Sequence, residues 1–174
     1  MTDMFMEKAA EISSCGGYRY SLLRRWDPGA YVQPVIMLNP STADAEIDDP
    51  TIKRCMAFAR RENFGGIRVF NLFAYRATSP ADMKAVKDPI GPKNDEALAE
   101  AFALSATPTL VAWGTDGGHL ARAAAVCAIA KQAGASLVCL GMTKDGHPRH
   151  PLYVKGSQPF VPYVPPAHTG VTPE

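Results

Sequence analysis

Polar side chains that can bind a small molecule occur in four short stretches, each at the end of an apolar run. The stretches are Asn39-Pro40-Ser41-Thr42, Asn71, Trp113-Gly114-Thr115-Asp116 and His147-Pro148-Arg149-His150. An asparagine amide offers hydrogen-bond donors and an acceptor, and a neutral histidine offers one of each. Such groups can pair with the edge of a planar, amide-bearing ligand such as a nucleobase. The residue types therefore predict a binding site of nucleobase size.

Motifs for other chemistries are absent from the sequence. It contains no G-x-S-x-G elbow and no P-loop, and its glycine pairs lack the dinucleotide-binding spacing. The cysteines never form the C-x-x-C pair on which zinc and iron–sulfur sites usually draw. Asp48 and Asp49 precede Pro50, which favours capping of a helix over binding of a cation. We therefore expect no metal and no cofactor.

The elements that must position the polar stretches alternate between strand and helix. Short apolar runs are typical of strands buried on both faces, and they occupy residues 35–38, 67–72, 109–113 and 136–140. Residues 18–26 are also β-prone and end in a turn signal.

Helical patterns separate these runs. One helical pattern begins at Pro50, and two others cover residues 94–104 and 119–133. The proline-containing stretch 73–92 is typical of a loop with one helical turn. The alternation predicts an α/β fold of three layers, a central and mostly parallel four-stranded sheet with helices on both faces. In such sheets the ligand lies beyond the carboxyl ends of the strands, where the polar stretches are expected.

Length and composition set further bounds. A chain of 174 residues suits one α/β domain, with a core at about residues 15–163 and peripheral tails. No apolar run approaches the roughly 20 residues of a spanning helix and no secretory signal pattern opens the chain, so we expect a cytoplasmic protein without a membrane partner. The net charge of +1 argues against strong overall attraction to nucleic acid, although eight arginines between positions 19 and 76 allow a local basic face. Nothing indicates an obligate protein partner.

Several longer strings carry a family resemblance. They are M-L-N-P-S-T-A-D, D-D-P-T-I-K-R-C, N-L-F-A-Y-R-A-T, A-W-G and H-P-L-Y. Through them the sequence resembles, from about Cys15 to Tyr163, a bacterial family known as domain of unknown function 1643. That label implies no activity.

The order of the motifs is also similar to that of the uracil-DNA glycosylase superfamily, which has a four-stranded parallel sheet. Asn39-Pro40 resembles the motif that ends its first strand, in the form used by the mismatch-specific branch. Asn71, within V-F-N-L-F-A, resembles a base-reading asparagine, and Trp113-Gly114 resembles the W-G after the third strand. His150-Pro151-Leu152 resembles the core of the His-Pro-Ser-Pro-Leu loop. Because the string here is H-P-R-H-P-L, His147 is an alternative to His150.

This resemblance implies a role for each residue. Asn39 orients the attacking water, Asn71 holds the base edge, and His150 donates a hydrogen bond to the departing base. Phe73 or Tyr75 stacks on the base. The residues expected to contact phosphate or the nucleic-acid backbone are Ser41, Thr42, Arg76 and Arg149.

Three functions fit these expectations. The leading one is a uracil-DNA glycosylase-like hydrolase of DNA repair or modification, which binds a flipped nucleobase and cleaves its N-glycosidic bond in nucleic acid. The near-neutral charge favours a hydrolase of a free or modified nucleoside or nucleotide instead. The missing carboxylate at Asn39 favours a non-catalytic module that binds a nucleobase or nucleic acid. The sequence leaves the base, and DNA against RNA, open.

Overall fold

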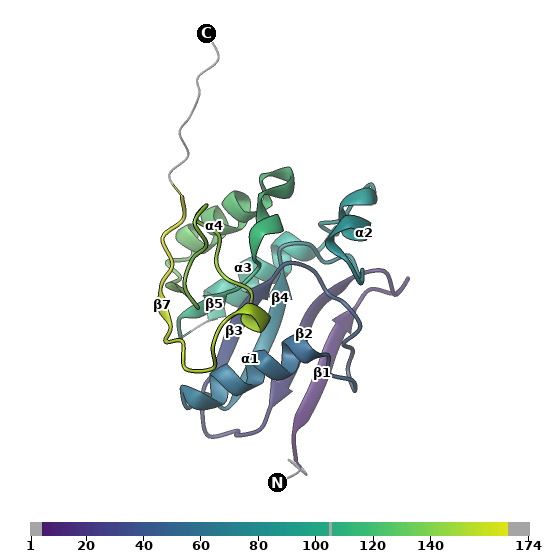
Figure 1. Cartoon of the computed structure of the whole chain (residues 1–174). Helices are drawn as coiled ribbons and strands as arrows, with labels where there is room; N and C mark the ends of the chain where they lie inside the picture. Colours follow the sequence, from purple (N-terminus) through teal and green to yellow (C-terminus); the bar gives the residue numbers. More distant parts are fainter. Residues whose placement is uncertain (1–4, 105, 167–174) are drawn as a thin grey trace.

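The computed structural model of the chain describes residues 5–104 and 106–166, through which a single mixed sheet runs (Figure 1). Within these residues the sheet has seven strands in the order β1-β2-β4-β3-β5-β6-β7. The strands are β1 Glu7–Ile12, β2 Arg19–Arg25, β3 Val32–Met37, β4 Gly66–Asn71, β5 Thr109–Val111, β6 Leu137–Cys139 and β7 Val161–Pro162. The helices are α1 Pro50–Arg61, α2 Pro80–Ala85, α3 Asn94–Leu104 and α4 Arg122–Gln132, with 3-10 turns η1 Thr115–Ala121 and η2 Pro151–Tyr153.

The middle of the sheet is parallel and its margins are antiparallel. β4, β3, β5 and β6 pair in parallel, whereas β1, β2 and β7 add antiparallel pairings at the two sides. All four predicted strands are present. The prediction of a four-stranded, mostly parallel sheet is nevertheless wrong, because seven strands are described and three of their six pairings are parallel.

The strands that the prediction omitted have weak sequence signals. β1 has the sequence E-K-A-A-E-I and is exposed along almost its whole length, so it lacks the alternation of a half-buried strand. β7 is only two residues long. Residues 7–12 therefore belong to the sheet, and the expectation that the chain before residue 15 is a peripheral tail is wrong. The ends of the expected tails, residues 1–4 and 167–174, lie outside the described residues.

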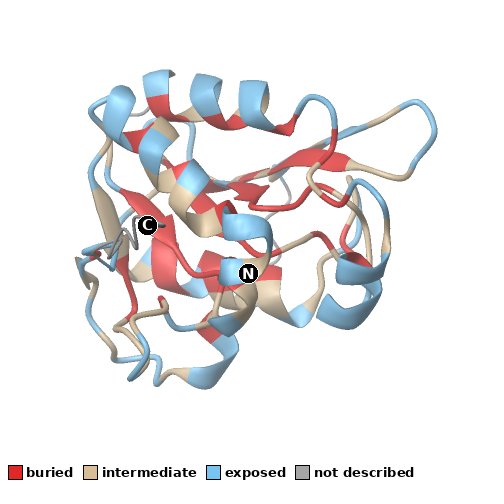
Figure 2. Cartoon of the chain, turned by 90° about the horizontal axis from the view of Figure 1, so that it is seen from above, coloured by how far each residue is buried: buried red, intermediate tan, exposed pale blue. Residues whose placement is uncertain are grey.

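Helices cover both faces of the sheet (Figures 1 and 2). On one face Ile52 of α1 packs in a buried cluster with Val35 of β3. On the other face Phe102 of α3 and Val126 of α4 pack with Ile36, the next residue of the same strand. Since adjacent strand residues point to opposite faces, β3 is covered on both sides, which accounts for its unbroken apolar run.

The helix boundaries follow local capping rules, with one exception. α1 begins where the Asp49 carboxylate accepts the N–H of Ile52 and Pro50 occupies the first turn. The expected helix from residue 119 instead starts at residue 122. Leu120 and Ala121 have φ of 54° and 53°, a left-handed conformation that interrupts the helix between η1 and α4. None of the helices in the described residues is long and apolar enough to cross a membrane.

Candidate functional site

A cavity of about 450 Å³ lies at the carboxyl ends of the parallel strands. Asn39 follows β3, Asn71 ends β4, Trp113 follows β5, and His150 comes from the loop after β6. All four side chains line this cavity. The structure therefore brings together the three residues on which the predicted site depends, although they are far apart in the sequence.

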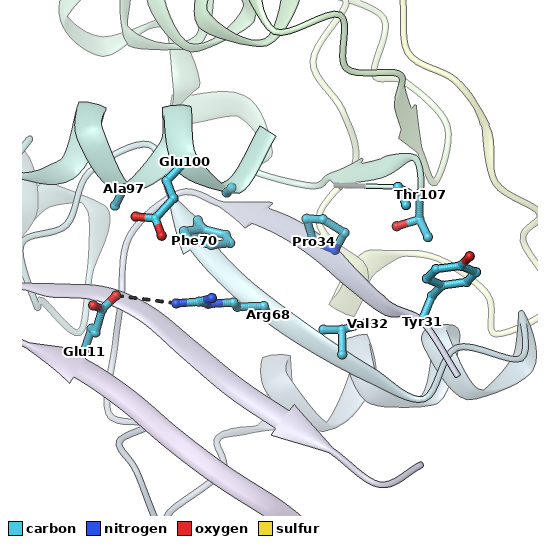
Figure 3. A pocket seen from close by; sticks show the side chains of 11 residues that line it. Glu11, Tyr31, Val32, Pro34, Arg68, Phe70, Ala97, Glu100 and Thr107 are labelled. Atoms are coloured by element: carbon cyan, nitrogen blue, oxygen red, sulfur yellow. Dashed lines mark ion pairs between the residues drawn. The ribbon is translucent and has the colours of Figure 1, made fainter. Parts of the chain in front are cut away.

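A second cavity of about 300 Å³ lies on the α3 side of the sheet, toward the amino end of β3 (Figure 3). Its charged groups face each other, since Arg68 lies 3.7 Å from a Glu11 oxygen and also covers the ring of Phe70. The side chains of Arg68 and Glu11 are 44% and 64% exposed, so water screens their charges. The strand-end cavity contains a buried polar side chain without a hydrogen-bond partner, Asn71, and we therefore consider it the better candidate site.

Asn71 is the most distinctive residue of the strand-end cavity. Its side chain is 1% exposed, and neither Nδ2 nor Oδ1 has a hydrogen-bond partner among the described residues. Buried polar groups are almost always paired, because leaving one unpaired costs about 1–3 kcal/mol. A donor and an acceptor on one planar amide are thus left without partners among the described residues, at a residue that lines the cavity.

The backbone of Asn71 and Leu72 is held in place by side chains of α3 and α4. Asn94 of α3 donates to the carbonyl oxygens of Asn71 and Leu72 at 2.9 and 3.0 Å. Arg122 of α4 donates to the same Leu72 oxygen at 2.6 Å and pairs with Asp95 at 2.6 Å. The end of β4 is therefore anchored to two helices, while the Asn71 side chain remains unpaired.

The orientation of the Asn39 amide is set by two carbonyl groups. Its Nδ2 donates to the oxygens of Pro40 and Ala77 at 3.0 and 2.9 Å. Only the NH₂ side of an amide can meet two carbonyl oxygens, so the assignment of its two ends is fixed. Oδ1 takes no part in these two bonds, and Asn39 lines the cavity.

His150 is arranged as a neutral hydrogen-bond donor. Its Nδ1 accepts the N–H of Leu152 at 3.2 Å, so in the neutral ring the proton is on Nε2. Burial lowers the pKa of His150, and the negative charge of Asp49 partly opposes this effect. His147 does not line the cavity, and its backbone N–H donates to Thr143. The geometry therefore favours His150 over His147.

The partial burial of His150 predicts a loss of stability in mild acid. Its folded pKa is lower than its unfolded pKa, so its contribution is complete above about 6.5, the ordinary histidine value, and is lost as the pH falls through the folded pKa. We expect His150→Gln, which cannot titrate, to show a smaller drop in unfolding free energy between pH 7.5 and 5.0 than the wild type. Urea denaturation at both pH values measures this, and equal drops would contradict it.

The expected stacking residues lie elsewhere. Phe73 is fully buried in the cluster beneath α3 and α4, with its ring centroid 5.6 Å from that of His119. Tyr75 packs edge-on against Tyr18, with 6.0 Å between ring centroids. Neither lines the cavity, so neither is placed to stack on a base bound there. The chain turns after Asn71, and the ring of Phe73 fills the core.

The residues expected to contact phosphate are divided. Ser41 lines the cavity, but Thr42 is exposed and outside it. Arg76 and Arg149 are also outside; each donates to a nearby backbone carbonyl, of Gly16 at 3.4 Å and of Met142 at 3.3 Å. Of this set, only Ser41 is placed to touch a molecule in the cavity.

Two charged residues that the sequence patterns did not assign to the site line the cavity. Arg19, at the start of β2, is 2% exposed, and its Nη1 donates to the Ala43 oxygen at 2.7 Å. Burial lowers the pKa of Arg19 to about 10, so it remains charged at pH 7. Asp49 both caps α1 and lines the cavity. A capping signal in the sequence gave no indication of this second position.

The fold and the cavity together define an α/β protein with a cavity at the carboxyl ends of parallel strands. Residues 19–152 match the family model described as protein of unknown function DUF1643, and the chain belongs to this family. The matched segment includes Asn39, Asn71 and His150. No curated protein and no solved structure matches the sequence. Among the described residues no group of three or more His, Cys, Asp or Glu side chains could hold a metal ion.

Proposed function

We propose that this protein is a uracil-DNA glycosylase-like hydrolase that binds a nucleobase of a nucleic acid in the strand-end cavity and hydrolyses its N-glycosidic bond. The observation that carries the proposal is the buried Asn71 amide, which has neither a donor nor an acceptor partner. A base edge supplies both partners at once. The cavity of about 450 Å³ has room for a base together with its sugar.

The other two residues position the attacking water and stabilise the departing base. Asn39 Oδ1 accepts a hydrogen bond from a water molecule and directs its oxygen toward the sugar carbon. As the bond breaks, negative charge develops on the base, and the Nε2–H of His150 donates to the base oxygen that carries it. Asn71 holds the base edge throughout, so that the departing base and the water stay on opposite sides of the sugar.

The rim of the cavity favours nucleic acid as the substrate. Leu152 and Tyr153 in η2 line the cavity and are 45% and 81% exposed. Apolar and aromatic side chains exposed beside a binding site are suited to stacking with bases, and wedges of this kind support the extrusion of a nucleotide from a duplex. A free nucleoside would leave these side chains without a role.

A free nucleoside or nucleotide is the second candidate substrate, and the net charge of +1 is the observation that favours it. The salt dependence of binding affinity distinguishes the two candidate substrates. Binding to nucleic acid releases counterions, so its affinity falls steeply with added salt, whereas binding of a nucleoside does not. Titration of a uracil-containing oligonucleotide and of deoxyuridine at 50 and 200 mM salt measures the difference.

An abasic-site assay tests the proposed activity. The substrates are oligonucleotides containing uracil, hypoxanthine or a thymine mismatch, each in single-stranded and duplex form. We expect His150→Ala to slow cleavage by about 10²–10³-fold, the cost of losing one donor to developing negative charge. His147→Ala is the matched control, and we expect it to cleave at the wild-type rate because His147 lies outside the cavity.

Two outcomes would contradict the proposal. Undiminished cleavage by His150→Ala would remove His150 from the mechanism. A wild-type protein that binds these oligonucleotides but releases no base would identify a non-catalytic binding module.

A further inference from the structure

Hydrolysis needs a group that accepts a proton from the attacking water, and the amide of Asn39 cannot do so. Two carboxylates line the cavity, those of Asp49 and Asp116. Asp116 is paired with Lys84, with 2.6 Å between Nζ and Oδ1. Oδ1 of Asp49 accepts the N–H of Ile52 at 2.9 Å, and no salt bridge involves its carboxylate within the described residues.

Asp49 lines the cavity together with Arg19 at the start of β2 and His150 beside η2. Its negative charge raises the pKa of Arg19 on one side and that of His150 on the other, in each case against the larger effect of burial. The same cavity holds the unpartnered amide of Asn71, which marks it as a ligand site independently of the helix end. Asp49 therefore lines the same space in which a ligand is expected.

The helix that carries Asp49 is also tied to the segment that carries His150. Arg54 of α1 donates to the carbonyl oxygens of Pro151 and Val154, at 3.3 and 2.6 Å. Arg54 follows Asp49 by five residues, or about one and a half turns of α1. The positions of the carboxylate and the imidazole are thus fixed relative to each other by one rigid element.

We infer that Asp49 is the general base of the reaction, an inference that rests on the proposed function. The carboxylate takes a proton from the water held by Asn39 while the water oxygen forms a bond to the anomeric carbon. The bond from this carbon to the base nitrogen breaks, and its electron pair leaves with the base. The proton on Asp49 then passes through solvent to the base anion, so that water is the only co-reactant.

The variant Asp49→Asn separates this role from helix capping, because asparagine caps a helix as well as aspartate does. We expect it to lower kcat for base release by at least about 100-fold with little change in KM or in the melting temperature. Asp27→Asn is the matched control: the Asp27 carboxylate accepts the N–H of Gly29 at 2.8 Å and lies outside the cavity. We expect full activity from this control.

A second measurement does not depend on turnover. The ring protons of His150 can be titrated by NMR, and Asp49→Asn should lower the pKa of His150 because it removes the charge that raises it. The other charged groups of the elements around His150, Arg19, Arg54 and the Asp116–Lys84 pair, are unchanged in this variant. An unchanged His150 pKa would overturn the placement of Asp49.

The two proposals fail in distinguishable ways. A wild type that releases no base overturns the proposed function and the role of Asp49 with it. An active wild type and an equally active Asp49→Asn overturn the inference alone. If Asp49→Asn loses activity and also has a lower melting temperature, Asp49→Ser distinguishes the two causes. Serine supplies a capping oxygen without a carboxylate, so this variant should be equally inactive.

Discussion

Asp48→Ala is expected to lower the free energy of unfolding by about 3–5 kcal/mol, because it leaves a buried guanidinium without its counter-charge. Arg24 is fully buried, and its Nε lies 2.6 Å from Oδ1 of Asp48. Arg24 also donates to the backbone oxygens of Asp44 and Ile47, so the loop between β3 and α1 depends on its position. Urea denaturation followed by circular dichroism measures the loss.

The double variant Arg24→Met/Asp48→Leu provides the control for this prediction. It removes both charges and should recover much of the lost stability, since apolar side chains of similar size often replace a buried ion pair without cost. Glu62→Ala is a second control, because the exposed Arg61–Glu62 pair should contribute at most about 1 kcal/mol. A loss below 1 kcal/mol for Asp48→Ala would show that Arg24 does not need its partner.

Asn71→Leu is expected to stabilise the free protein by about 1–3 kcal/mol and to abolish its binding function. The substitution replaces a buried, unpartnered amide with an apolar side chain of similar size. The same change removes the donor and acceptor for a base, so we expect binding of a uracil-containing oligonucleotide to weaken by at least about 100-fold. A residue that costs stability but is required for binding has the signature of a functional site.

Asn94→Leu is the matched control for the expected increase in stability. Asn94 is equally buried, but its Nδ2 makes two hydrogen bonds, to the oxygens of Asn71 and Leu72. The same substitution should therefore destabilise the protein here, by about 1–3 kcal/mol. Melting temperatures of both variants, with and without the oligonucleotide, test the contrast. Destabilisation by Asn71→Leu would show that its amide is structural.

The sequence predicted that Asn39, Asn71 and His150 lie around one cavity, because the topology of the sheet determines where they meet. Parallel strands end at one edge of the sheet, so Asn39, Asn71 and the loop with His150 had to meet once the four strands were recognised. The unbroken apolar run of β3 gave a clear signal for a strand covered on both faces. These features depend on patterns within short segments.

The remaining features depend on contacts that no short segment reveals. Arg19 reaches the cavity because β2 pairs antiparallel with β4, which brings the start of β2 to the strand ends. Phe73 follows Asn71 closely, yet it turns into the core because the space beneath α3 and α4 must be filled. The sequence Asp48-Asp49-Pro50 predicts a helix cap. Nothing in these three residues indicates that Asp49 also lines a cavity.

The attachment of β4 to α3 and α4 has a consequence for how this protein can diverge. The Leu72 carbonyl accepts hydrogen bonds from both Asn94 and Arg122. Leu72 directly follows Asn71, whose amide is unpaired. Substitutions in either helix can rotate or shift that amide from the far side of the sheet. Ligand preference among relatives can therefore change while every residue that touches the ligand stays the same.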